Sequence, residues 1–404
     1  MIFLFVRKKI NFLSLNSFII GNIIGSGVLL LPSSLARFGS FGIYAYFLSA
    51  LAMFSIGMVF FKLQTWTGCQ GVHGPIKSMF GEKAGAVAAF VYWLSVVFGN
   101  GSMIATLFSY MGLYSISFSK VFFYSFLIMS LITLANSFDI RMVEIIEIAV
   151  AFIKVIPLLV IPMMCFYKAY FSEIPFPPVY DFNQAIYKGI PIALWAFLGI
   201  ETAVIISKKV ENPEKNIPRA LTLSLCIISL IYMLGFWVMV KLIPNLSSST
   251  SPYADLLCFI LPNSYSCYVG YFIRALSVML ILGTIYGWVF TSGIIIQDSA
   301  NEGLMPRIFA KQNKFGSPAI GLWISSVLST LFITLTYQES ILSHFELMTE
   351  ILVLMTFSIY LFANFAFFSV VLKQNKKTFT NLAYGAVSLF SIIFAMFSII
   401  KNIL

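Results

Sequence analysis

Charged residues inside long apolar runs are the first chemical signal of this sequence. Lys154 and Glu201 each stand near the middle of such a run, and Glu350, to which the sequence gives no role, stands in a third. An ionisable side chain in lipid is costly, so it normally marks a substrate, ion or proton pathway. Desolvation disfavours the charged form of an acid or an amine, so Glu201 and Lys154 are candidates for proton coupling or gating. Glu144 and Glu147 lie toward the end of the run that holds Lys154, and we expect them to be solvated.

Two of the apolar runs also contain helix-breaking patterns. The first holds Gly21-Asn-Ile-Ile-Gly-Ser-Gly27, and each glycine inside a helix costs roughly 1 kcal/mol relative to alanine. The other holds Pro191, followed by Trp195-Ala-Phe-Leu-Gly-Ile-Glu201. Interrupted helices at matching positions of two halves indicate a transporter's binding site near the middle of the membrane. Glycine that merely allows close helix packing explains one such segment better than it explains a matched pair.

A broken helix supplies ligands for charged groups from its own backbone. The N–H groups at the start of its second half lie at the positive end of the helix dipole. Those near Ser26 and Gly27 therefore suit a carboxylate. Carbonyls freed at the end of each first half suit an ammonium group. Together, the two breaks predict a site for the head group of an amino acid.

The elements that position these residues follow from the composition. Of the 404 residues, 60% are hydrophobic and only 10% are charged, against about a quarter charged in soluble domains. Apolar runs recur at the length of about 20 residues that a bilayer demands. They are too long and uniform for barrel strands, and helices satisfy their own backbone groups in lipid. The eleven predicted spans lie near residues 12–35, 40–62, 84–113, 120–138, 143–167, 184–207, 219–243, 268–298, 318–337, 345–372 and 380–400.

The placement of positive charge predicts the orientation. Seventeen Lys and Arg residues lie at the N-terminus and in connections on its side, and seven lie on the opposite side. Because Lys and Arg concentrate on the cytoplasmic side, we expect a multi-pass protein of the inner membrane with a cytoplasmic N-terminus. The net charge of +10 comes from these clusters between spans, so it predicts contact with the membrane surface and no nucleic-acid partner.

Three stretches together resemble the amino acid–polyamine–organocation superfamily. Residues 21–32, GNIIGSGVLLLP, are similar to its first-helix signature. Residues 195–201, WAFLGIE, with 210–219, VENPEKNIPR, are similar to its sixth helix and the following loop. Residues 298–306, DSANEGLMP, are similar to the end of its eighth helix. The similarity extends from about residue 11 to 372 and is greatest to the basic amino acid/polyamine antiporters, in particular to the arginine/agmatine antiporter.

The resemblance implies both a fold and a set of site residues. The fold is an all-α membrane protein with five-plus-five inverted repeats and broken helices 1 and 6. One transporter domain would span residues 1–404, with a ten-helix transport core (1–372) and one additional helix (373–404). The implied site uses carbonyls of Ile23, Trp195 and Leu198 for the substrate ammonium, and Glu201 as a proton-sensitive residue. The substrate-binding residues are Asn22, Ile23, Gly25, Ser26, Gly27, Tyr92, Asn100, Met103, Trp195, Leu198 and Trp288.

The sequence departs from the arginine/agmatine antiporter in two ways. At Lys154 that antiporter carries a small apolar residue. There the chain instead resembles proton-coupled permeases of the superfamily, in which a lysine on this helix occupies the place of a sodium ion. The family normally has twelve spans, and the last two help to form a homodimer in this group of antiporters. With eleven spans predicted here, a homodimer is left open, whereas the ten-span core is complete.

Three functions are therefore weighed. Exchange of arginine for agmatine, or of related amines, by alternating access is favoured by Asn100, Trp195 and Trp288, since a guanidinium stacked on a Trp face gains roughly 0.5–2 kcal/mol. A proton-coupled amino-acid uptake permease is favoured by Lys154. A transport-inactive membrane sensor or partner subunit is the third. No nucleophile–base pair or metal-ligand spacing occurs, so we expect no enzyme, cofactor or metal. The expected partners are small amino acids or amines and the lipid bilayer.

Overall fold

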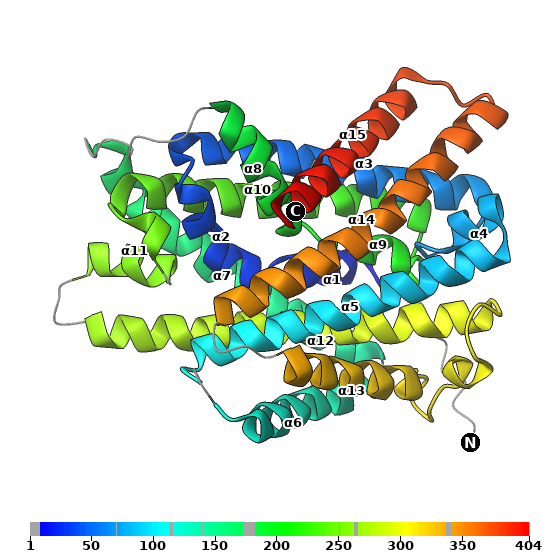
Figure 1. Cartoon of the computed structure of the whole chain (residues 1–404), viewed down its shortest axis with the longest axis horizontal. Coiled ribbons are helices and arrows are strands. Elements are labelled where there is room, and N and C mark those ends of the chain that lie inside the picture. The colour runs from blue at the N-terminus through cyan, green and yellow to red at the C-terminus, as the bar shows by residue number, and fades with distance from the viewer. Residues whose placement is uncertain are drawn as a thin grey trace.

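Long helices occupy the apolar segments of the chain (Figure 1). The computed structural model describes residues 9–69, 71–113, 116–138, 140–172, 182–249, 251–261, 266–336 and 341–403. The α-helices are α1 (Phe12–Ile23), α2 (Ser26–Ala36), α3 (Gly42–Thr67), α4 (Gly74–Phe80), α5 (Glu82–Tyr110), α6 (Phe118–Asn136), α7 (Ile140–Tyr170), α8 (Phe182–Trp195), α9 (Thr202–Ile205), α10 (Pro213–Leu242), α11 (Pro252–Ile260), α12 (Ser266–Asn301), α13 (Ala319–Thr336), α14 (Ile341–Lys373) and α15 (Phe379–Ile403).

Most of the long helices have the length and apolar composition of membrane spans. Within the described residues, eight helices are long and apolar enough for a span, and the bent pair α1–α2 makes a ninth. The other two predicted spans correspond to the pair α8–α9 and to α13, whose apolar part, Ala319–Leu335, is shorter. The prediction of an all-α, multi-pass membrane protein is confirmed.

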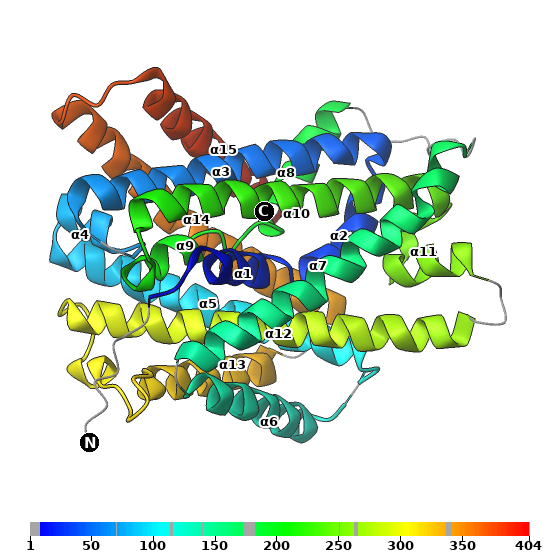
Figure 2. The same ribbon diagram turned by 180° about the vertical axis from the view of Figure 1, so that it is seen from behind.

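The helices repeat in two blocks of five spans. The first block comprises α1–α2, α3, α5, α6 and α7, and the second comprises α8–α9, α10, α12, α13 and α14. Each block begins with a broken helix and has a short helix after its second span. These short helices, α4 and α11, were not predicted. They lie at opposite ends of the molecule in both views (Figures 1 and 2), as an inverted repeat requires.

The contacts between the blocks are reciprocal. The first element of each block packs on the second element of the other, α1 on α10 and α8 on α3. The blocks also meet where α5 packs along α14 and α12 and where α1 packs on α12. The broken elements α1 and α9 lie in the middle of the molecule in both views (Figures 1 and 2). Both breaks are therefore enclosed by continuous helices.

Burial separates the central helices from those that face outward. In α12, 89% of the most apolar window is buried, whereas the corresponding fraction is 28% in α6 and 33% in α7 and in α15. The exposed apolar side chains of these outer helices suit contact with lipid. The last helix, α15, packs on α3, α8 and α14 and so lies outside the five-plus-five core.

Candidate functional site

The first break separates α1 from α2 in the centre of the molecule. Helix α1 ends at Ile23, Ile24 and Gly25 interrupt it, and the two segments are bent by 49°. Gly25 is the N-cap of α2 and has no side chain to bond the first N–H groups of that helix. These groups, which include those of Ser26 and Gly27, are the unsatisfied donors of a helix N-terminus. The predicted break is therefore present, although the side chain of Ser26 lies outside the described residues.

The second break lies between α8 and α9. Helix α8 ends at Trp195, residues 196–201 form turns, and α9 begins at Thr202. Gly199 has a φ of +110°, a backbone conformation that side chains disfavour. A Cβ on Gly199 would also lie 3.1 Å from the carbonyl oxygen of Asn22. Glycine is required here because the two breaks touch each other through their backbones.

Tyr232 of α10 ties the two breaks together. Its buried hydroxyl lies 3.1 Å from the carbonyl oxygen of Ala196 and 3.4 Å from that of Ile23. The carbonyl of Trp195 accepts a bond from the N–H of Leu198 at 3.2 Å. Two of the three carbonyls expected to bind an ammonium thus already accept long hydrogen bonds. Each still has a second lone pair that a ligand can use.

Lys154 of α7 lies next to the first break and is fully buried. Its Nζ donates to the carbonyls of Gly21 at 2.6 Å and Ile24 at 2.8 Å, and to the hydroxyl of Thr284 at 2.7 Å. An ammonium has three N–H donors, so all of them are used. Lys154 therefore links α7 to both sides of the break in α1 and to α12.

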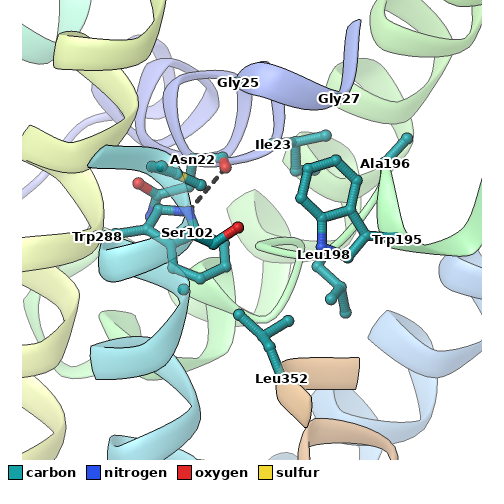
Figure 3. Close-up of a pocket in the computed structure, with 12 residues that line it drawn as sticks. Asn22, Ile23, Gly25, Gly27, Ser102, Trp195, Ala196, Leu198, Trp288 and Leu352 are labelled. Carbon is teal, nitrogen blue, oxygen red and sulfur yellow. Dashed lines mark hydrogen bonds between the residues drawn. The ribbon is translucent and has the colours of Figure 1, made fainter. Parts of the chain in front are cut away.

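A cavity lies where the two breaks meet (Figure 3). The indole rings of Trp288 and Trp195 border it from opposite sides, with Leu352 at a third side. Trp288 Nε1 donates to the carbonyl of Asn22 at 2.8 Å, which fixes the plane of that ring. The lining residues are Asn22, Ile23, Gly25, Gly27, Gly99, Ser102, Met103, Trp195, Ala196, Leu198, Trp288 and Leu352. None of them carries a charge.

Glycines allow the rings to approach the backbone. A Cβ on Gly27 would come within 2.7 Å of Trp195 Cζ3, and one on Gly99 would overlap Trp288 and Leu352. Gly25 has a different neighbour, because its Cβ would meet the methyl group of Thr284 at 3.0 Å. A larger residue at position 27 would thus displace a cavity wall, whereas one at position 25 would disturb the contact with α12.

Two predicted substrate-binding residues do not line the cavity. The hydroxyl of Tyr92 donates to Glu201 Oε1 at 2.6 Å, and the N–H of Gly199 donates to Glu201 Oε2 at 3.1 Å. Tyr92 and Glu201 therefore brace the second break. Asn100 is fully buried on α5, and its amide has no hydrogen-bond partner among the described residues.

The expectation that Glu147 is solvated was wrong. Its side chain is completely buried against Gly21 of α1 and Gly287 of α12. The predicted span began too late, because α7 starts at Ile140 and places Glu147 well inside the helix. Glu144 is partly buried. The side chain of Glu350 lies outside the described residues.

Charged residues join several elements at one end of the molecule. Lys208 Nζ lies 3.8 Å from both Asp298 Oδ1 and Glu302 Oε1, and Lys77 Nζ donates to the Glu302 carbonyl at 3.1 Å. His73 Nε2 is 3.5 Å from Glu302 Oε2. Burial would raise the pKa of the Glu302 carboxyl, but His73, Lys208 and Lys77 together hold it below its ordinary value. Glu302 is therefore ionised at neutral pH and anchors this cluster.

Several residues of the site were missed from the sequence. Thr284 and Thr291 recur at helical spacing with the predicted Trp288 on one face of α12, and this pattern was available beforehand. Thr202 and Tyr232 gave no such signal, because each is a single polar group whose partners lie on other helices.

The fold and the buried site between two broken helices are those of a membrane transporter. The chain belongs to the amino acid permease family, whose profile matches residues 10–403. Its structure is similar to that of Mhp1, a nucleobase-cation-symport-1 family transporter, with a TM-score of 0.59 and 12% sequence identity. That match covers 98% of this chain and 94% of the other. At this identity, the likeness concerns the fold alone.

Curated relatives are transporters of amines and amino acids. The chain is 28% identical to the putrescine transporter PotE of Escherichia coli (strain K12), over 82% of this chain and 77% of that protein. It is 27% identical to PotE of Haemophilus influenzae, over 95% and 91% of the two chains. It is 25% identical to the cadaverine/lysine antiporter of E. coli (strain K12), over 82% and 76%. These relatives place it among transporters of amino acids and amines, not among enzymes.

The contact between Gly27 and Trp195 yields a prediction about stability. In Gly27→Ala, the added methyl group forces the Trp195 ring to move, and overpacking of this kind costs about 1–3 kcal/mol. We expect a lower melting temperature and a shifted tryptophan emission in detergent solution. Gly270→Ala is the matched control, because nothing lies within 4 Å of a Cβ there. Equal melting temperatures for the two variants would show that the Trp195 wall is not packed against Gly27.

Proposed function

We propose that this chain exchanges a cationic amino acid, arginine in the first instance, for its amine agmatine or a related polyamine by alternating access. The observation that carries the proposal is the uncharged cavity between the indole rings of Trp195 and Trp288 (Figure 3). A cation beside an aromatic ring is attracted by the electrons of the ring face. The amines and amino acids in the names of the relatives support this class of substrate.

The two breaks supply the rest of the recognition. The free N–H groups at the start of α2 suit a carboxylate, and the carbonyls of Ile23, Trp195 and Leu198 suit an ammonium group. An amino acid presents both groups, whereas its decarboxylated amine presents only the second. A site whose aromatic walls bind the shared cationic end accepts both molecules in turn, as an exchanger requires. Asn100, whose amide has no partner among the described residues, lies outside this cavity, and a contact with the guanidinium would require α5 to turn in another state of the transport cycle.

The charged cluster around Glu302 provides one gate in this proposal. It joins the α4 region, the end of α12 and Lys208, which follows α9. The pairing of Ile10 N–H with the Lys209 carbonyl at 2.6 Å ties the start of α1 to the same end. The distribution of Lys and Arg assigns this end to the cytoplasm. Opening toward the cytoplasm therefore requires these contacts to separate.

A proton-coupled uptake permease is the second candidate, and Lys154 favours it. The buried ammonium bridges the first break, so loss of its proton would weaken a contact on which the site depends. Such a residue can couple proton movement to the shape of the site. The two candidates differ in whether net uptake occurs without exchange.

Counterflow in proteoliposomes separates these functions. We expect radiolabelled arginine or agmatine to enter only vesicles that contain unlabelled substrate, and putrescine and lysine complete the panel. Accumulation driven by a pH gradient into empty vesicles, abolished by Lys154→Ala, would replace the exchanger with the permease. No uptake of any panel member under either condition would contradict both.

The cation–π role of Trp288 yields a second prediction. Trp288→Ala should weaken agmatine binding by about 2- to 30-fold, which corresponds to roughly 0.5–2 kcal/mol. Trp288→Phe should retain part of the affinity, because it keeps an aromatic face. Trp323→Ala is the control, since Trp323 lies on α13 and does not line the cavity. Calorimetric titration of well-folded variants measures the affinities, and wild-type affinity in Trp288→Ala would remove this ring from the site.

A further inference from the structure

Glu147 is a buried carboxyl group with no role in the site described so far. It lies two helical turns before Lys154 on α7, and its side chain is wholly buried. A Cβ on Gly21 would overlap Glu147 Oε2, and one on Gly287 would lie 2.8 Å from Oε1. Neither oxygen has a hydrogen-bond donor among the described residues. A buried acceptor without a donor costs about 1–3 kcal/mol, and more when it is charged.

Asn22 contributes another unpaired oxygen at the same place. Its Nδ2 donates to Thr202 Oγ1 at 2.7 Å and to Thr291 Oγ1 at 3.1 Å. The Thr291 hydroxyl proton is already donated to the Gly287 carbonyl at 2.9 Å. With its proton on the Gly287 carbonyl, Thr291 accepts from Asn22 Nδ2, and this pairing favours the amide orientation with Nδ2 toward Thr202 and Thr291. Asn22 Oδ1 then points to Gly287, where a Cβ would overlap it, and it has no donor among the described residues.

Asn22 Oδ1 and Glu147 Oε1 thus both lie beside Gly287, close to the place that a Cβ there would occupy. Lys154 does not supply the missing donor, because its three N–H groups bond Gly21, Ile24 and Thr284. Lys154 on α7 and Tyr286 on α12 are the titratable groups that interact with Glu147 within the described chain. A proton on Glu147 would let Oε1 donate to Asn22 Oδ1, whereas a metal cation there would be repelled by the positive charge of Lys154.

We propose that Glu147 is a proton-binding site whose neutral carboxyl donates to Asn22 Oδ1, and that this proton is linked to substrate binding through Asn22. The carbonyl of Asn22 holds Trp288 Nε1, so the same residue joins Glu147 to a wall of the cavity. When Glu147 loses its proton to solvent, Glu147 Oε1 and Asn22 Oδ1 no longer share a hydrogen and repel each other. The position of Asn22 is then destabilised. Linkage is reciprocal, so substrate binding changes the affinity of Glu147 for its proton. The link to substrate binding rests on the proposed function, whereas the proton site itself does not.

Infrared difference spectroscopy between acidic and basic pH tests the proton site directly. The wild-type protein should show the carbonyl stretch of a protonated carboxyl group above the amide I band. Glu147→Gln, which keeps the size and a donor for Asn22, should lack that component. Glu214→Gln is the control, since Glu214 is an exposed carboxyl in the first turn of α10. A full wild-type band in a folded Glu147→Gln variant would overturn the proposal, whether or not the protein transports amines.

Calorimetric titration tests the link to the substrate. With agmatine or arginine as probe, wild-type affinity should change with pH, and buffers of different ionisation enthalpy should reveal proton exchange on binding. Glu147→Gln should bind the probe with an affinity that no longer follows pH in this range. The link would be overturned if the affinity of Glu147→Gln changed with pH as the wild-type affinity does. It would also be overturned if the wild-type affinity changed when sodium replaced choline in the buffer but did not change with pH. If the wild type binds no probe, the proposed function fails and the link with it, while the infrared result still decides the proton site.

Discussion

The backbone of an interrupted helix inside a membrane must find its hydrogen bonds within the protein, and this constraint shapes the whole site. Lys154 meets it at the first break by donating to the carbonyls of Gly21 and Ile24 and to Thr284. Tyr232 does the same between the breaks. Because lipid offers no alternative partner, these buried donors determine where the helix is broken and which backbone groups stay free for a ligand.

The aromatic cavity follows from the same arrangement. Gly199 lets the second break cross against Asn22, and that contact brings Trp195 and Trp288 to either side of one space (Figure 3). A buried ammonium close by would repel a second cation in a medium of low dielectric constant. Aromatic faces and neutral acceptors are then the suitable walls for a cationic substrate.

Much of this fold could be predicted from the sequence, because hydrophobic length and glycine clusters are local signals. Both breaks and the eleven spans were found in this way. The position of Glu147 was not, since its burial depends on glycines of α1 and α12 that are distant in sequence. Tyr92 and Asn100 were assigned by resemblance, but the cavity wall depends on the rotation of α5 about its axis. The short helices α4 and α11 lie in connections without a long apolar run.

The central claim is that the Lys154 ammonium holds the first helix in its broken form. Hydrogen–deuterium exchange of the purified protein tests it, comparing wild type with Lys154→Met, which keeps the length of the side chain but donates no hydrogen bond. Lys168→Met, on the exposed end of the same helix, is the control. The account predicts faster amide exchange around residues 20–28 in Lys154→Met and no change there in Lys168→Met. Wild-type protection of residues 20–28 in Lys154→Met would contradict it.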